Sequence, residues 1–124
     1  MKSVVETRIL DSLIVAQSLF DGDRERKVRW LVVLSDMLED SERARFEKQE
    51  LSDSFVRKLI DRQKTSGALP KLPGVQVFVA GASARTSGKF LEVQRFWTQY
   101  LKEAGTAIEP GRYVRQGLVF PKEE

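Results

Sequence analysis

The stretch VQVFVAGASARTSGKF, residues 75–90, has the pattern of a strand, a glycine-containing loop and the start of a helix. A phosphate-binding loop needs a glycine, four residues and then Gly-Lys-Ser/Thr, because backbone N–H groups wrap the phosphates and the hydroxyl binds magnesium. Here Phe90 follows Gly88-Lys89, and Ser83 stands where the first glycine is required. We therefore interpret the stretch as a core strand followed by a loop, without a phosphate-loop motif.

Helical and strand patterns alternate along the rest of the chain. A continuous apolar run at residues 30–34 is typical of a strand covered on both faces, and further strands are predicted at residues 75–80 and about 113–120. Helical patterns cover residues 3–20, 39–67 and 89–104. Such alternation favours a parallel sheet with right-handed crossovers. We predict an α/β fold, a three-layer Rossmann-like parallel sheet with helices on both faces, incomplete, with about three strands and three helices.

Each predicted helix has an apolar stripe at helical spacing. Ser52 or Asp53 is expected to cap the second helix, and Thr86 or Ser87 the third, because short polar side chains accept hydrogen bonds from the first turn. Gly105 is expected to end the third helix. The residues expected to be buried are Val5, Ile9, Leu13, Ala16, Phe20, Phe55, Leu59, Phe90, Val93, Trp97, Tyr100, Leu101 and Ala104.

Length and composition bound the chemistry. The 124 residues are expected to form a single domain, 1–124, with a charged tail at 121–124. The sequence has no cysteine and no histidine, which excludes disulfides, thiolate or imidazole metal sites, cysteine nucleophiles and histidine-dependent triads. A metal would need oxygen ligands, which suit magnesium, calcium or manganese.

The charge pattern bears on partners and location. The 21 basic and 18 acidic residues are interspersed, which is typical of a solvated surface, so nucleic acid is not an expected partner. Phe96, Trp97 and Tyr100 have the spacing of a helix core rather than of a base-stacking surface. The N-terminus lacks a secretory pattern, and no apolar run approaches the ~20 residues that span a bilayer. We expect a cytoplasmic location and no membrane partner.

A family resemblance is carried by four segments: ETRILDSL, VRWLVVLSDMLED, LPKLPGVQVFVAG and FLEVQRFWTQYLKEAGTAI. In this order and spacing they resemble the C-terminal half of a von Willebrand factor type A (VWA) domain, particularly bacterial ones, over roughly residues 5–108. The resemblance implies that the first three strands of the family fold are missing. It also implies that the Asp-x-Ser-x-Ser loop of the family's metal-ion-dependent adhesion site is missing.

The same resemblance implies a partial metal site. Thr7 matches the family's metal-site threonine and Asp36 its aspartate, so the site would be vestigial or completed by another chain. We expect no cofactor, and Mg²⁺ or Mn²⁺ only if the site is completed from elsewhere, because a hard cation takes six or more oxygen ligands. Asp36 could instead cap the turn after its strand. It also occupies the position of a receiver-domain phosphoacceptor, but the receiver's acidic pair is absent.

A polar rim is predicted at the carboxyl edge of the sheet, where the ligand-facing loops of open α/β sheets lie. Its candidate binding residues are Ser35, Ser83, Arg85, Thr86, Ser87 and Lys89. The alternative is a solvated loop that caps the third helix.

The strand at 30–34 raises a further question, because simple sequential order places it at an edge of the sheet although it is apolar throughout. Such an edge is a template for pairing with another chain. We therefore expect a homodimer, or an assembly with a chain that supplies the missing strands.

The function that we predict is a non-enzymatic protein–protein interaction module with an incomplete metal-ion-dependent adhesion site. The identity of its protein partner stays open. The alternative is a small α/β nucleotide-binding protein or enzyme that uses the Gly81–Lys89 loop.

Overall fold

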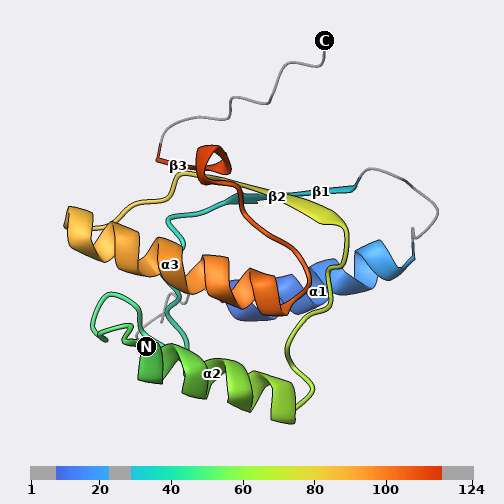
Figure 1. The fold of residues 1–124 in the computed structure, drawn as a ribbon, viewed down its shortest axis with the longest axis horizontal. Helices are drawn as coiled ribbons and strands as arrows, with labels where there is room; N and C mark the ends of the chain where they lie inside the picture. Colours follow the sequence, from blue (N-terminus) through green and yellow to red (C-terminus); the bar gives the residue numbers. More distant parts are fainter. Residues whose placement is uncertain (1–7, 23–28, 116–124) are drawn as a thin grey trace, which may run out of the picture.

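A computed structural model describes residues 8–22 and 29–115 of the chain (Figure 1). Within these residues the elements follow the order helix, strand, helix, strand, helix, strand, with a short 3-10 turn before the last strand. They are α1 (Ile9–Asp21), β1 (Arg29–Leu34), α2 (Asp53–Thr65), β2 (Val75–Ala80), α3 (Ser87–Glu103), η1 (Pro110–Arg112) and β3 (Tyr113–Val114).

The described strands form a parallel sheet in the order β1-β2-β3. β1 and β2 pair along their whole length, from Arg29 opposite Val75 to Leu34 opposite Ala80. β3 pairs with the carboxyl end of β2 through Tyr113 and Val114 alone. The predicted α/β class, with three helices and a three-stranded parallel sheet in the described part of the chain, is confirmed.

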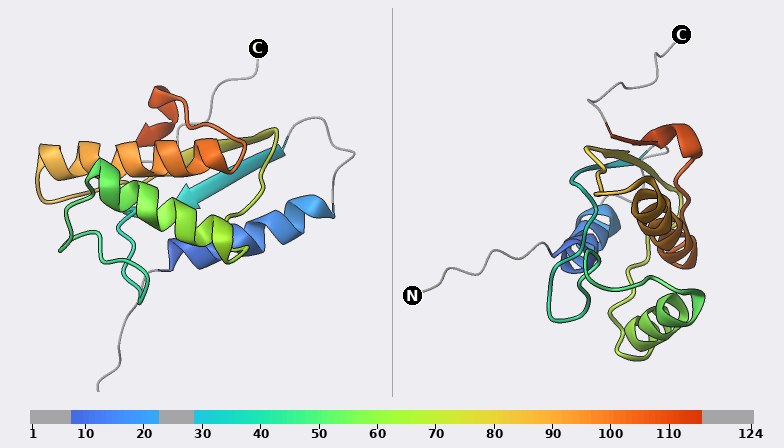
Figure 2. Two further views of the ribbon diagram at one scale, coloured as in Figure 1. Left: turned by 60° about the horizontal axis from the view of Figure 1, so that its bottom comes forward. Right: turned by 90° about the vertical axis from the view of Figure 1, so that its left-hand side faces the viewer.

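The described helices all lie on one side of the sheet, whereas the sequence pattern predicted helices on both faces. Figure 2 shows α1 and α3 directly beneath the sheet and α2 further from it. The strand side chains agree, because Val75, Val77 and Val79 of β2 belong to the same hydrophobic core as the helices, with Leu31 and Val33 of β1 packed against it. The alternate residues of each strand, such as Trp30 and Val32, therefore face away from the helices.

Aromatic residues of α3 form the centre of the core. Phe96, Trp97 and Tyr100 are completely buried, and Phe46 from the β1–α2 loop joins them. The ring centroids of Phe46 and Phe96 lie 4.7 Å apart in an edge-to-face arrangement. These residues are therefore core, as their helical spacing predicted, and not a stacking surface.

The remaining core predictions also hold within the described residues. Ile9, Leu13, Ala16, Leu59, Val93, Leu101 and Ala104 are buried, and Phe20, Phe55 and Phe90 are partly buried against the core. Ser52 caps α2 and Thr86 caps α3, each by accepting a hydrogen bond from the backbone N–H three residues later. Val5 and the predicted strand residues 116–120 lie outside the described part of the chain.

Residues 39–51 form a loop, although their charge pattern suggested a helix from 39 to 67. The loop makes its own backbone pairs: Phe46 N–H donates to the Glu39 carbonyl at 2.9 Å, and Ser41 N–H donates to the Ala44 carbonyl at 2.9 Å. Phe46 and Leu51 are completely buried, at a spacing that a single helical face does not provide. Tertiary burial of these apolar side chains therefore outweighs the local helical tendency.

Candidate functional site

The loops after β1 and β2 meet at the carboxyl edge of the sheet. Ser35 N–H donates to the Ala80 carbonyl at 3.0 Å, and Ser83 N–H donates to the Asp36 carbonyl at 3.3 Å. Gly81 lies between these bonds with φ +89°, and a Cβ on it would sit 3.5 Å from the Ser35 carbonyl oxygen. Backbone hydrogen bonds thus hold together the two loops that carry the predicted rim, the loop after β1 and the loop after β2.

Ser35 and Asp36 use their side chains to shape the turn after β1. The Ser35 hydroxyl accepts a hydrogen bond from Met37 N–H at 3.0 Å, and Asp36 Oδ1 accepts one from Leu38 N–H at 2.9 Å. Met37 between them has φ +67°, a conformation that costs energy for a side chain other than glycine. The turn-capping alternative for Asp36 is therefore observed.

The described residues around Asp36 offer few oxygens that could bind a divalent cation. One Asp36 oxygen and the Ser35 hydroxyl already accept backbone hydrogen bonds. Among residues 8–22 and 29–115, no three carboxylates are grouped in a way that could hold a metal. Thr7, the other residue predicted for the metal site, lies outside the described residues. A hard cation would need most of its oxygen ligands from elsewhere.

The binding residues of the β2–α3 loop divide into two groups. Arg85, Thr86 and Lys89 line a cavity of about 390 Å³ that they share with residues 47–50 of the β1–α2 loop. Asp36 lines an adjoining cavity of about 180 Å³. Ser35, Ser83 and Ser87 are not among the residues that line the larger cavity.

Lys89 joins the two loops instead of facing open solvent. Its ammonium donates to the Gln49 carbonyl at 2.5 Å and to Glu92 Oε1 at 3.3 Å. The same Glu92 oxygen accepts a hydrogen bond from Leu51 N–H. Lys89 therefore already has two protein partners, and the larger cavity contains both basic and acidic side chains.

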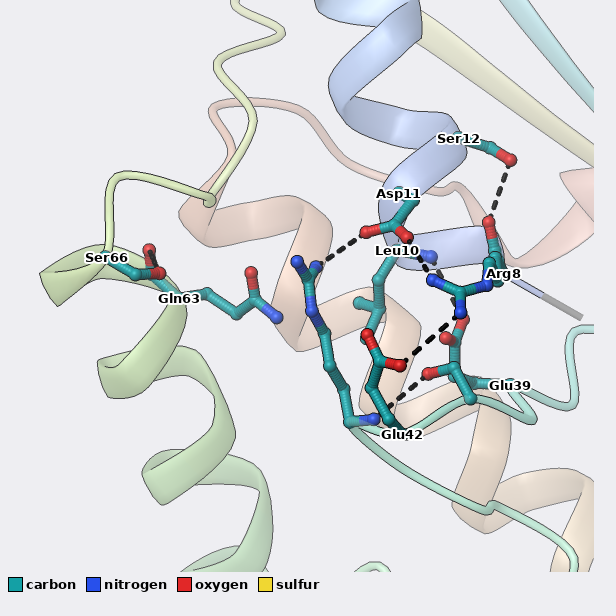
Figure 3. Close-up of polar contacts among 10 residues, drawn as sticks. Arg8, Leu10, Asp11, Ser12, Glu39, Glu42, Gln63 and Ser66 are labelled. Carbon is teal, nitrogen blue, oxygen red and sulfur yellow. Dashed lines mark hydrogen bonds and ion pairs between the residues drawn. The ribbon is translucent and has the colours of Figure 1, made fainter.

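A buried carboxyl group that the sequence did not reveal lies at the start of α1 (Figure 3). Glu39 is 1% exposed, and its Oε1 accepts a hydrogen bond of 3.0 Å from Leu10 N–H in the first turn of the helix. Arg8, the residue before α1, makes no side-chain cap. Glu39 thus acts as a helix cap from 29 residues away in the sequence.

Burial raises the pKa of the Glu39 carboxyl group above its usual value of 4.5, because the charged form loses its hydration. The nearby Ser41 side chain and the backbone N–H groups of Leu10 and Ile9 favour the charged form and oppose this rise, and the nearby charge of Asp11 adds to it. The sequence signal was indirect: a helix that begins without a local capping residue must find another acceptor.

An ion-pair network surrounds Glu39 on the surface. Asp11 pairs with Arg43 at 2.7 Å and with Arg8 at 3.1 Å, and Arg8 also reaches Glu42 at 3.4 Å (Figure 3). These pairs connect α1 to the β1–α2 loop. Exposed pairs of this kind contribute little to stability individually.

Three buried oxygens, Glu39 Oε2, Gln63 Oε1 and Tyr100 Oη, have no hydrogen-bond partner in the described part of the protein. Burial raises the pKa of the Tyr100 hydroxyl; the charge of Arg43 opposes this effect, and those of Glu39 and Asp11 add to it. The charges of Arg43, Glu39 and Asp11 therefore influence the pKa of Tyr100.

The outer edge of β1 is the other exposed feature. In the described residues β1 pairs with β2 on one side and with no strand on the other. Five of its six side chains are only half-buried, and Leu34 is 67% exposed. The predicted apolar edge strand is therefore present in the structure.

No family model matches the chain, and neither a curated protein nor a solved structure is significantly similar to it. No helix in the described ranges is long and apolar enough to cross a membrane.

Proposed function

We propose that the protein is a non-enzymatic interaction module whose edge strand β1 pairs with a strand of a protein partner. The observation that carries this proposal is the outer edge of β1, which pairs with no strand among residues 8–22 and 29–115 and combines outward backbone groups with apolar side chains. A partner strand would satisfy those groups and bury those side chains in one step.

The apolar character of β1 supports this role. Edge strands that stay exposed carry charges, prolines or bulges that prevent association. Residues 30–34, WLVVL, contain no charged residue and no proline. Such a strand is suited to a permanent neighbour on its outer side.

The carboxyl edge would supply specificity. Asp36 lies two residues after β1 and is exposed, and the cavity lined by Arg85 and Thr86 adjoins the one lined by Asp36. A partner that continues the sheet beyond β1 would lie close to these polar groups. If this chain is a partial VWA-like unit, as its sequence motifs suggest, a metal at Asp36 would require that partner to bring the remaining ligands.

The Gly81–Lys89 loop supports nucleotide binding less well. Thr86 caps α3, and Lys89 is bonded to Gln49 and Glu92, so the groups that would cradle a phosphate already have protein partners. We therefore place the interaction surface at the β1 edge.

Hydrogen exchange of individual β1 amides tests the proposal. Ser35 N–H donates to Ala80 of β2, and N–H direction alternates along a strand, so Leu31 and Val33 also direct their N–H groups toward β2. These two amides should therefore be protected from exchange at every protein concentration. The amides of Trp30, Val32 and Leu34 should exchange quickly in the free protein and slowly once a partner binds. Protection of these outward amides in a dilute monomer would show that the chain covers its own edge, which would contradict the proposal.

A further inference from the structure

The outward backbone groups of β1 belong to alternate residues. Because Ser35 N–H bonds to Ala80 of β2, the odd-numbered residues of β1 direct their N–H and C=O groups toward β2. The groups of Trp30, Val32 and Leu34 therefore point to the free edge. The side chains of these three residues also share the sheet face that lies away from the helices.

We propose that the partner strand is β1 of a second copy of this chain, antiparallel about a two-fold axis that passes between the two Val32 residues. This inference rests on the proposed function and identifies its partner. Trp30 then lies opposite the partner's Leu34, and Leu31 opposite the partner's Val33. The two copies would form one continuous sheet with all described helices on the same side.

Strand geometry selects this register. Residues directly opposite each other in an antiparallel pair point to the same face, so a shift by one residue would place helix-facing side chains opposite outward ones. With Val32 on the axis, every outward residue of β1 faces another outward residue and can exchange both backbone hydrogen bonds with it. Moving the axis to Leu31 would place Leu34 opposite a residue before the described strand, and moving it to Val33 would place Trp30 opposite Asp36, after the strand.

The charges at the ends of β1 favour the antiparallel arrangement. Arg29 stands at the amino end, and the exposed Asp36 follows the carboxyl end. Antiparallel pairing brings Arg29 opposite the partner's Ser35 and next to the partner's Asp36. Parallel pairing would instead place like charges opposite each other, which is destabilising. The strand is thus complementary to its own reversed copy.

α1 carries two further exposed apolar side chains. Val15 and Leu19, one turn apart on α1, are 63% and 72% exposed. α1 is the helix that lies under β1, at the opposite flank of the helical layer from α3 (Figure 2). Pairing of the strands brings the two copies of α1 next to each other, so these side chains can be buried in the same interface.

Site-specific thiol cross-linking tests the register, because the natural chain has no cysteine. The Val32→Cys variant places two thiols side by side on the axis, since opposite Cα atoms in a hydrogen-bonded antiparallel pair are about 5.5 Å apart. A reagent that bridges only adjacent thiols should convert it to a covalent dimer. Gln76→Cys is the matched control: it lies beside Trp30 on β2 and on the same face, but its counterpart is about three strand spacings across and four residues along the sheet, ~20 Å away.

Two further variants separate registers. Trp30→Cys and Leu34→Cys should each fail to cross-link alone and should cross-link when mixed, because each lies opposite the other. Cross-linking of either variant alone, in a protein that sedimentation shows to be a dimer, would overturn this register and leave the proposed function standing. If the protein stays a monomer at high concentration and its outward amides exchange quickly, the proposed homodimer is wrong, but the β1 edge is still available to another partner. A monomer with protected outward amides would overturn both proposals.

Discussion

The indole N–H of Trp97 donates a hydrogen bond of 2.9 Å to the Met37 carbonyl, across 60 residues of sequence. Trp97 is completely buried in α3, and Met37 occupies the turn after β1 with φ +67°. This bond fixes the carboxyl end of β1 to the helix beneath the sheet. Packing of α3 and the shape of the site are therefore coupled through one side chain.

Truncation of Trp97 should remove a large part of the stability. We expect Trp97→Ala to lower the free energy of unfolding by roughly 3–5 kcal/mol, because it leaves a large cavity in the aromatic core. Urea denaturation measures the loss. Trp97→Phe keeps an aromatic ring but leaves the Met37 carbonyl unpaired, at a cost of about 1–3 kcal/mol. An unchanged urea midpoint for Trp97→Ala would contradict the burial of this residue.

The elements whose pattern is local could be predicted from the sequence. β2 occupies Val75–Ala80 as predicted, because a short, β-branched and mostly apolar segment bounded by glycines is typical of a buried strand. Ser52 and Thr86 cap their helices as expected, because capping depends on neighbours within three residues. The α/β order followed from these local signals.

The features that depend on distant partners could not be predicted. The cap on α1 comes from Glu39, and the burial of Phe46 depends on Phe96, fifty residues later in the chain. The loops after β1 and β2 are bonded to each other at the end of the strands, but a partner of Lys89 comes from the β1–α2 loop. The missing local cap of α1 shows that an acceptor is needed but does not identify Glu39, and the sequence near Phe46 and Lys89 does not indicate their partners.

Glu39 should make stability depend on pH. Because its folded-state pKa is raised, its contribution is fully present below the unfolded value of 4.5 and is lost as the pH rises through the folded-state pKa. Glu39→Gln removes this titration and keeps an oxygen for Leu10 N–H. We therefore expect a flatter stability profile for Glu39→Gln than for the natural chain as the pH rises above the unfolded value of 4.5, measured by urea denaturation.

Glu42→Gln is the control for this prediction, because Glu42 is exposed and pairs with Arg8 on the surface. It should leave the slope of the profile unchanged. The same slope for the natural chain and Glu39→Gln would show that Glu39 does not titrate differently in the folded state.

The neighbouring hydroxyls of Thr86 and Ser87 should differ in their effect on α3. Thr86 accepts the hydrogen bond from Lys89 N–H at 3.0 Å, whereas Ser87 is the exposed first residue of the helix. Thr86→Ala should destabilise the protein by about 1 kcal/mol and Ser87→Ala by much less. Equal losses in thermal or urea unfolding would show that the cap at Thr86 contributes nothing specific.

Divalent cations should bind the chain weakly or not at all, because the described groups around Asp36 supply few free oxygens. Isothermal titration with Mg²⁺ and Mn²⁺ measures this. Saturable binding at low micromolar concentration that disappears in Asp36→Ala would contradict the prediction. It would show that another part of the assembly completes the site.

Leu19 and Leu91 provide a matched pair of exposed leucines for the dimer. Leu19 lies on α1 and is 72% exposed, and Leu91 lies on α3 and is 61% exposed. Leu19→Glu should raise the dissociation constant of the dimer by about tenfold or more, because each copy would place a new charge in an apolar contact; tenfold corresponds to about 1.4 kcal/mol. Leu91→Glu lies far from the β1 edge and should leave the constant unchanged. Sedimentation equilibrium of both variants gives the two constants, and equal constants would show that α1 lies outside the interface even if β1 pairs as proposed.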